Sequence, residues 1–321
     1  MKKEFVGKTI YFLGDSITAH GHYIYNLRSY FHKNCQKCFV YNRGTGGNRV
    51  IMSQYILDDE IKGKQPDYVI VCFGANDLGI WLYDSKKKVT PELLKNRKAR
   101  DDEYFLGYRI IVKMIKERGA IPVIMSPFAV DQLLTEREDI ETLADNDEKE
   151  DYIGPSFYKR KTFENINAAL KGYAENLEKI AKETGALYIP LFEKTYEKML
   201  SEAGMFGADG IHYTEDKGHS VIAEVLLDFF GCERPFTFEK TSDNDEIFKL
   251  EQLERRAGNL RRATPFNPIF GEFSEEQIRQ AAIKAAAAPE KWRKNIGEAY
   301  LKYGDKIFEL REKIFEMTEN F

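Results

Sequence analysis

The sequence predicts an α/β protein: a flavodoxin-like three-layer α/β/α fold with a five-stranded parallel sheet, followed by an all-helical C-terminal extension. Short apolar segments recur along the first 230 residues; they are 9–13, 38–41, 68–73, 121–125 and 187–190. Amphipathic helical patterns lie between them, as at 104–118 and 163–184. Such alternation is typical of a parallel sheet covered on both faces. Beyond Cys232 the alternation stops and only helical patterns follow.

Each of the five apolar segments has the features of a strand. Each is short, is rich in β-branched or aromatic residues, and ends in or before glycine, asparagine, serine or proline. The first one, Thr-Ile-Tyr-Phe-Leu at 9–13, follows an apolar stretch that Gly7 and Lys8 interrupt, and no small-residue cleavage site follows. This pattern favours a first strand over a signal peptide and therefore a cytoplasmic protein.

The helical extension predicts a boundary after Cys232, with an α/β domain at 1–232 and a helical region at 233–321. A charged helix is expected at 245–260, and Ser274-Glu275-Glu276-Gln277 is a capping box that opens an alanine-rich helix ending at Pro289. Apolar residues then recur at spacings of four and three; they are Ile296, Tyr300, Tyr303, Ile307, Leu310, Ile314, Met317 and Phe321. We expect a long helix packed on its own domain, and the alternative is a coiled coil that makes a homo-oligomer.

Composition excludes several classes of protein. The 321 residues are 43% hydrophobic and 31% charged, which is typical of a soluble globular chain of roughly two domains. With 48 Lys and Arg against 52 Asp and Glu, the chain lacks the basic excess of a nucleic-acid binder. No apolar run approaches the ~18 residues of a membrane helix, so we expect neither nucleic acid nor membrane as a partner.

Cofactor and metal motifs are also absent. The glycines at 44–47 have the wrong spacing for a dinucleotide fingerprint, and GxSxG, a P-loop and HExxH do not occur. Cys35 and Cys38 form a CxxC and His20 and His22 an HxH, but neither pair has further ligands at metal-binding spacing. We therefore expect no metal and no cofactor, with His20 and His22 at a solvent-facing helix start.

Polar and glycine residues cluster where the predicted strands end. They are residues 14–18, 42–48 and 74–77, together with 209–212 after the last strand. In a parallel α/β sheet the functional site lies beyond the carboxyl ends of the strands, so these clusters should meet. His212 follows Asp209 in a loop and is the candidate base, whereas His219 lies in a helix and is expected to be structural.

Ser16 could simply cap the helix that follows the first strand. Capping would not explain why Gly47 and Asn76 follow the next two strands, or why Asp209 and His212 follow the last. The four blocks Gly-Asp-Ser-Ile-Thr, Asn-Arg-Gly-Thr-Gly-Gly-Asn, Gly-Ala-Asn-Asp and Asp-Gly-Ile-His resemble, in order and placement, those of the SGNH hydrolases, the GDSL esterase/lipase superfamily. The resemblance covers about residues 5–232, so the domain at 1–232 is expected to be an SGNH-type hydrolase.

The resemblance implies a role for each residue. Ser16 is the nucleophile, His212 the base that takes its proton, and Asp209 the carboxylate that orients the imidazole. The backbone N–H groups of Ser16 and Gly47 and the side-chain amide of Asn76 form the oxyanion hole. The blocks look most like those of bacterial carbohydrate esterases, which implies hydrolysis of small acyl esters, acetyl groups on sugars first. The alternatives are a thioesterase or lysophospholipase with a longer acyl preference, and a catalytically idle protein that binds a partner.

Two charged segments interrupt the α/β pattern. Residues 84–103 are basic and residues 131–151 are acidic, and both follow strand ends. We expect two solvated surface loops, and the alternative is a pair of complementary lids over the site.

Overall fold

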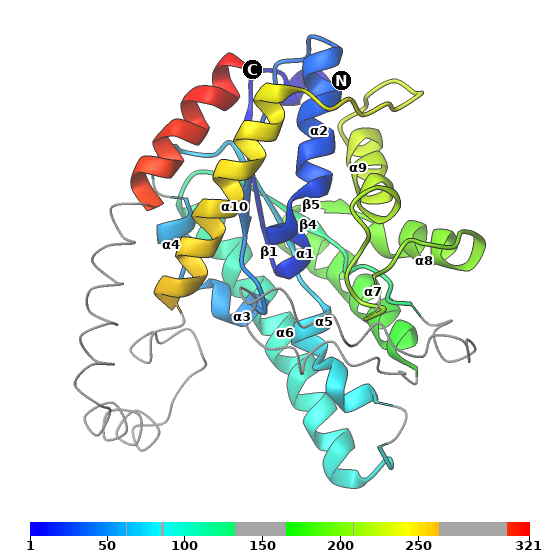
Figure 1. Ribbon diagram of the computed structural model, residues 1–321. Coiled ribbons are helices and arrows are strands. Elements are labelled where there is room, and N and C mark those ends of the chain that lie inside the picture. The colour runs from blue at the N-terminus through cyan, green and yellow to red at the C-terminus, as the bar shows by residue number, and fades with distance from the viewer. Residues whose placement is uncertain (62, 85–86, 132–164, 208, 263–306) are drawn as a thin grey trace, which may run out of the picture.

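A five-stranded, all-parallel sheet forms the centre of the computed structural model (Figure 1). The model describes residues 1–61, 63–84, 87–131, 165–207, 209–262 and 307–321. The strands are β1 (Thr9–Gly14), β2 (Phe39–Gly44), β3 (Tyr68–Cys72), β4 (Ile121–Met125) and β5 (Leu187–Ile189). Their order is β2-β1-β3-β4-β5, so the chain reverses its direction of travel across the sheet between β1 and β3. The predicted fold class and all five strands are confirmed.

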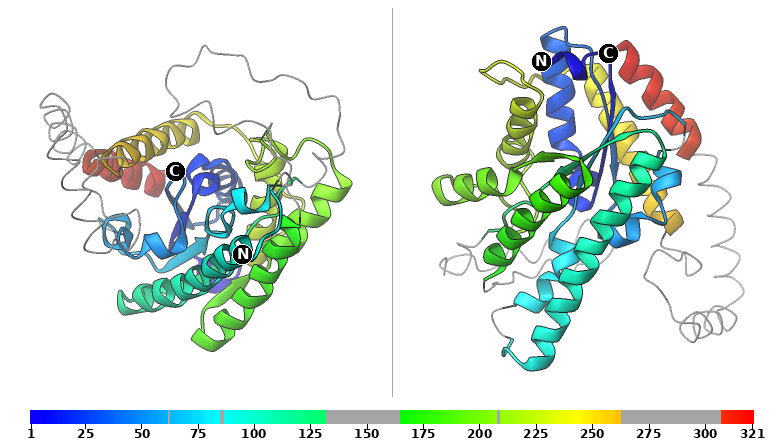
Figure 2. Two further views of the ribbon diagram at one scale, coloured as in Figure 1. Left: turned by 90° about the horizontal axis from the view of Figure 1, so that it is seen from below. Right: turned by 180° about the vertical axis from the view of Figure 1, so that it is seen from behind.

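Helices cover both faces of the sheet, which gives three layers (Figure 2). One face packs against α2 (His22–Lys33) and α9 (Lys217–Phe229), and the other packs against α6 (Pro91–Glu117) and α7 (Ile166–Thr184). Alternate residues of β1 divide between these two cores, with Phe12 on the α2 side and Leu13 on the α6 side. The shorter elements are η1 (Lys3–Phe5), α1 (Ser16–His20), α3 (Val50–Ser53), α4 (Leu57–Glu60), α5 (Ala75–Leu78), η2 (Ile80–Tyr83) and α8 (Leu191–Ser201).

The basic segment at 84–103 is not a loop throughout. Residues 91–103 are the first half of α6, so the prediction of a solvated loop is wrong there. Thr90 caps the helix, since its hydroxyl accepts a hydrogen bond from the Leu93 N–H at 3.1 Å, and Pro91 occupies the first turn. The acidic segment at 131–151 lies outside the described residues except for Asp131. The alternative of two complementary lids is therefore not tested.

The C-terminal helices pack on the α/β domain beside β2, the edge strand (Figure 1). Helix α10 (Ser242–Arg262) contacts α1, α2 and β2, and a last helix spans 307–320. Ile247 of α10 and Ile314 of the last helix are fully buried in the core on the α6 side. The charged helix expected at 245–260 is confirmed as α10, and the expectation of a helix packed on its own domain is confirmed for 307–320.

Other expectations for the extension remain untested. The capping box at Ser274, the alanine-rich helix and the apolar residues at 296–303 lie outside the described residues. The division at residue 232, the homo-oligomer and the cytoplasmic location stay predictions. Within the described residues, no helix is both long enough and apolar enough to cross a membrane.

Candidate active site

The strand ends bring the predicted site residues to one edge of the sheet. Ser16 is the first residue of α1, directly after β1, and Asn76 lies in α5, directly after β3. Gly47 is in the turn that follows β2 and has a φ of +69°. Asp209 and His212 lie in the loop before α9. The position of the site beyond the carboxyl ends of the strands agrees with the sequence-based expectation.

Ser16, His212 and Asp209 form a continuous hydrogen-bonded chain. Ser16 Oγ lies 2.8 Å from His212 Nε2, and His212 Nδ1 lies 2.5 Å from Asp209 Oδ2. The second carboxylate oxygen of Asp209 accepts hydrogen bonds from the backbone N–H groups of Ile211 and His212, both at 2.9 Å. These bonds fix the carboxylate against the imidazole, so that His212 can present Nε2 to the serine hydroxyl.

The charge of Asp209 tunes the imidazole. Burial alone would lower the pKa of His212, but the hydrogen bond with Asp209 and the negative charges of Asp209 and Asp15 outweigh burial and raise it. Burial would likewise raise the pKa of Asp209, but the hydrogen bond with His212 and its charge lower it. The two shifts are opposite in sign, as expected for an ion pair, since each group stabilises the charged form of the other.

Close backbone packing holds Ser16 in place. Asp15 caps α1, because its Oδ1 accepts a hydrogen bond from the Ile17 N–H at 3.0 Å. Burial raises the pKa of this carboxyl group to about 6. A Cβ on Gly14 would lie 2.1 Å from Thr18 Oγ1, so only glycine fits between β1 and the first turn of α1.

Asn76 lies beside the loop that carries Gly47. Its Nδ2 group is 3.3 Å from the carbonyl oxygen of Asn48 and 3.5 Å from Asp15 Oδ2. The next residue, Asp77, accepts a hydrogen bond from the Val50 N–H at 2.8 Å. The segments after β2 and β3 are thereby joined near Ser16. The roles of Ser16, Gly47 and Asn76 as oxyanion donors stay a prediction.

Two further histidines pack close to His212. The rings of His20 and His212 have their centroids 5.0 Å apart, so the expectation that His20 faces solvent is wrong. Burial, with the nearby charge of His212, lowers the pKa of His20 to about 4. His219 is fully buried and accepts a hydrogen bond from the Tyr23 N–H at 3.2 Å, in keeping with its expected structural role.

No group of three or more His, Cys, Asp or Glu within the described residues could hold a metal ion. The HxH pair serves other contacts instead, since His22 Nε2 lies 3.4 Å from Glu215 Oε1. Cys35 is exposed and Cys38 is buried, and neither forms a disulfide.

No pattern in the sequence predicts which residues of α10 lie near the site. Phe248 and Gln252 of this helix line a cavity of about 690 Å³ together with His20 and His22. The residues from α10 are more than 200 positions away from His20 and His22 in the sequence, and the charged pattern of α10 does not predict that they lie together. Only the packing of α10 against α1 brings them together.

Comparison with known proteins agrees with this geometry. Residues 12–220 match the model of the GDSL-like lipase/acylhydrolase family. An acetylxylan esterase from Geobacillus stearothermophilus is similar in structure, with 20% identity and a TM-score of 0.52 over 72% of this chain and 98% of that one. An α/β hydrolase from the metagenome of Lake Arreo has 19% identity and a TM-score of 0.50 over 72% and 98%.

A third structure is similar over almost the whole chain. It is a gut microbial diltiazem-metabolizing enzyme, with 16% identity and a TM-score of 0.63 over 99% of this chain and 97% of that one. Comparison with curated protein sequences gave no match. The family match spans well over half of the chain, and the chain therefore belongs to the GDSL-like lipase/acylhydrolase family and is a carboxylic ester hydrolase of the SGNH type.

Proposed function

We propose that this protein is a serine esterase that removes small acyl groups, acetyl above all, from carbohydrate hydroxyl groups. The observation that carries the proposal is the 2.8 Å contact between Ser16 Oγ and His212 Nε2, with Asp209 behind the imidazole. A serine hydroxyl is a weak nucleophile at neutral pH and needs a base within hydrogen-bonding distance. His212 meets that requirement.

The proposed reaction has two halves. Ser16 Oγ attacks the acyl carbonyl carbon while its proton passes to His212 Nε2, and Asp209 stabilises the resulting imidazolium. The negative charge that forms on the carbonyl oxygen is held by the N–H groups of Ser16 and Gly47 and the amide of Asn76. The ester C–O bond then breaks, and the alcohol leaves with the proton from His212. Water attacks the acyl-enzyme by the same route and releases the acid.

The walls of the nearby cavity support a polar substrate. The cavity next to the loop that carries His212 combines polar side chains, among them His20, His22 and Gln252, with the aromatic rings of Tyr213 and Phe248. A channel for a long acyl chain would be predominantly apolar. One of the proteins with a similar fold is an acetylxylan esterase, which is in keeping with an acetylated sugar as the substrate class.

A series of p-nitrophenyl esters from acetate to laurate tests the proposal. The wild-type protein should hydrolyse the acetate fastest, and Ser16→Ala should abolish turnover while the thermal midpoint stays close to that of the wild type. Ser201→Ala is the matched control, because Ser201 is exposed and its hydroxyl contacts only backbone carbonyl groups of its own helix, α8. It should keep full activity.

The outcomes separate the alternatives. Activity that survives Ser16→Ala would overturn the mechanism. Ser16-dependent activity that increases with chain length would replace the small-acyl proposal with a thioesterase or lysophospholipase. Absence of Ser16-dependent activity on the esters and on acetylated xylo-oligosaccharides would favour a protein that binds a partner without catalysis.

A further inference from the structure

The helix that carries Ser16 ends in carbonyl groups that need external donors. Helix α1 has only five residues and ends at Gly21, whose φ is +78°. The last carbonyl groups of a helix have no partners within it. Here the side-chain amide of Gln252 donates to the carbonyl oxygens of both Ala19 and His20, at 3.1 and 3.0 Å. Asn42 Nδ2 also donates to the carbonyl oxygen of Ala19, at 3.3 Å, but of these two residues only Gln252 holds the carbonyl oxygen of His20. A residue of α10 therefore helps to hold the end of the nucleophile helix.

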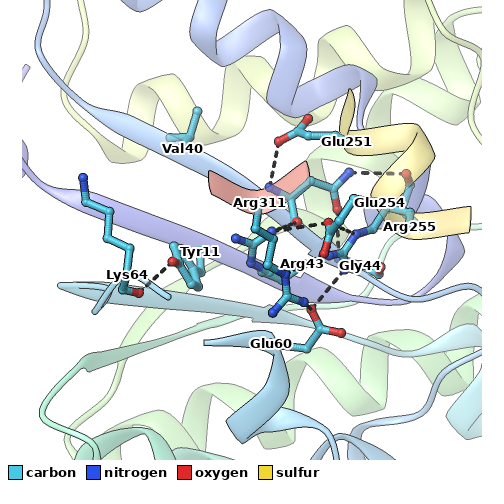
Figure 3. A network of polar contacts seen from close by, with 12 residues as sticks. Tyr11, Val40, Arg43, Gly44, Glu60, Lys64, Glu251, Glu254, Arg255 and Arg311 are labelled. Carbon is cyan, nitrogen blue, oxygen red and sulfur yellow. Dashed lines mark hydrogen bonds and ion pairs between the residues drawn. The ribbon is translucent and has the colours of Figure 1, made fainter. Parts of the chain in front are cut away.

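Helix α10 is itself fixed by the buried charges of Glu251 and Arg255 (Figure 3), which lie on either side of Gln252 in the sequence. Arg28 of α2 forms a two-point ion pair with Glu251, at 2.9 and 2.8 Å. One turn further along α10, Arg255 Nη1 donates to the carbonyl oxygen of Gly44 at the end of β2, at 3.1 Å. Because these side chains are almost fully buried, α10 is a firm support for Gln252.

Gln252 is linked to the proposed base through His20. The amide holds the backbone carbonyl of His20, and the ring of His20 packs on the ring of His212. Ser16 lies one turn before His20 on the same helix. A shift of the α1 terminus would therefore move Ser16 and the face of the imidazole relative to each other.

We propose that Gln252 is a positioning residue, which sets the relative placement of Ser16 and His212 by holding the C-terminal carbonyl groups of α1. The proposal rests on the proposed function of Ser16 and His212. It assigns to α10 an indirect part in catalysis, through the position of α1. Helix α10 lies outside residues 12–220, the span of the family match.

A series of Gln252 variants separates hydrogen bonding from packing. Gln252→Met keeps the volume and removes the donor. Gln252→Glu keeps the shape but directs carboxylate oxygens toward the two carbonyl oxygens. Gln252→Lys changes the shape but keeps an N–H donor with enough reach. A packing role predicts that Glu resembles the wild type and Lys is worst, whereas a positioning role predicts the reverse.

We expect kcat for p-nitrophenyl acetate to fall about tenfold in Gln252→Met and further in Gln252→Glu, with KM almost unchanged, because a displacement of ~1 Å can cost up to ~100-fold in rate. Gln252→Lys should retain most of the wild-type kcat. The rates are measured on the high-pH plateau, where the charge of the new side chain no longer changes the protonation of His212. All variants should fold, since Gln252 is only partly buried.

Tyr25→Phe is the matched control. It removes another hydrogen bond between α2 and α10, from Tyr25 Oη to Asp245 Oδ1 at 2.8 Å, without touching α1. Its kcat should equal that of the wild type even if its thermal midpoint falls. Equal kcat values for wild type, Met and Glu at position 252 would overturn the positioning role, as would an equal loss in Tyr25→Phe. Ser16→Ala is measured in parallel. Activity that survives Ser16→Ala would show that the proposed function is wrong, whereas activity that depends on Ser16 but not on Gln252 would show that only the positioning role is wrong.

Discussion

The ion pair of Arg28 and Glu251 predicts a large and specific loss of stability. The two side chains are 2% and 0% exposed, so water cannot take the place of either partner. Glu251→Gln keeps the shape of the side chain and removes its charge. The guanidinium of Arg28 would then be buried with neutral acceptors only, chiefly Asn244 Oδ1 at 2.9 Å and the Val40 carbonyl oxygen at 3.3 Å.

The expected magnitude follows from the burial of the pair. Removal of one partner of a buried pair costs about 3–5 kcal/mol. We expect the lower value, about 3 kcal/mol in the free energy of unfolding, because the neutral acceptors of Arg28 remain and the new amide can still accept one hydrogen bond. In a protein of this size that loss lowers the thermal midpoint by roughly 4–5 °C.

Urea unfolding followed by circular dichroism measures the effect. Glu251→Gln should lower the urea midpoint at an unchanged slope. The control is Glu239→Gln, which removes the ion pair of Glu239 with Lys33, also between α2 and the segment after Cys232 but at 39% and 58% exposure. Glu239→Gln should lower the free energy of unfolding by less than about 1 kcal/mol. Arg28→Met combined with Glu251→Leu should recover most of the loss. Equal midpoints for the two glutamate variants would refute the reasoning.

Two further predictions concern the site. The raised pKa of His212 predicts that kcat/KM increases with pH, with a midpoint above 6.5, the ordinary histidine value. The reason is that only the neutral imidazole can accept the serine proton. A midpoint at or below 6.5 would contradict the role of His212 as the base. Gly44→Ala should lose most activity, because the new Cβ would lie 2.2 Å from the Ala19 nitrogen in α1. Gly47→Ala, whose Cβ would meet nothing within 4 Å, should cost only about 1–2 kcal/mol of stability for its positive φ. Similar thermal midpoints in the two variants would argue against the close contact at Gly44.

The strands could be predicted because their apolar residues are contiguous, but one boundary was hidden by polar residues. Strand β2 continues to Gly44 beyond the expected end at residue 41, since Asn42, Arg43 and Gly44 pair with β1. Asn42 and Arg43 are buried within the fold, and their polarity alone had indicated a loop. The guanidinium of Arg43 is accommodated over the ring of Tyr11, 4.7 Å from its centroid, a contact that no local pattern could reveal.

The site residues could be predicted for a different reason. A nucleophile, a base and its carboxylate must be particular residue types, and in a parallel sheet they must follow strands, so Ser16, Asp209 and His212 stand out in the sequence. Gln252 has no such signature. A glutamine on a charged helix is ordinary, and its contact with α1 exists only because distant buried charges dock α10 at that place.

Those buried charges also bear on how the α/β part and the extension depend on each other. Arg43 and Glu60, from the α/β part, are buried together with Glu254, Arg255 and Arg311 from the extension (Figure 3). Burial would raise the pKa of Glu254, but the three guanidinium groups around it outweigh burial and lower the pKa to about 2. A buried charge without a partner costs several kcal/mol. The α/β part thus contains charges whose partners are supplied by the extension. The helix that stabilises these charges is the same one that holds the end of α1, so stability and the placement of Ser16 have a common structural origin.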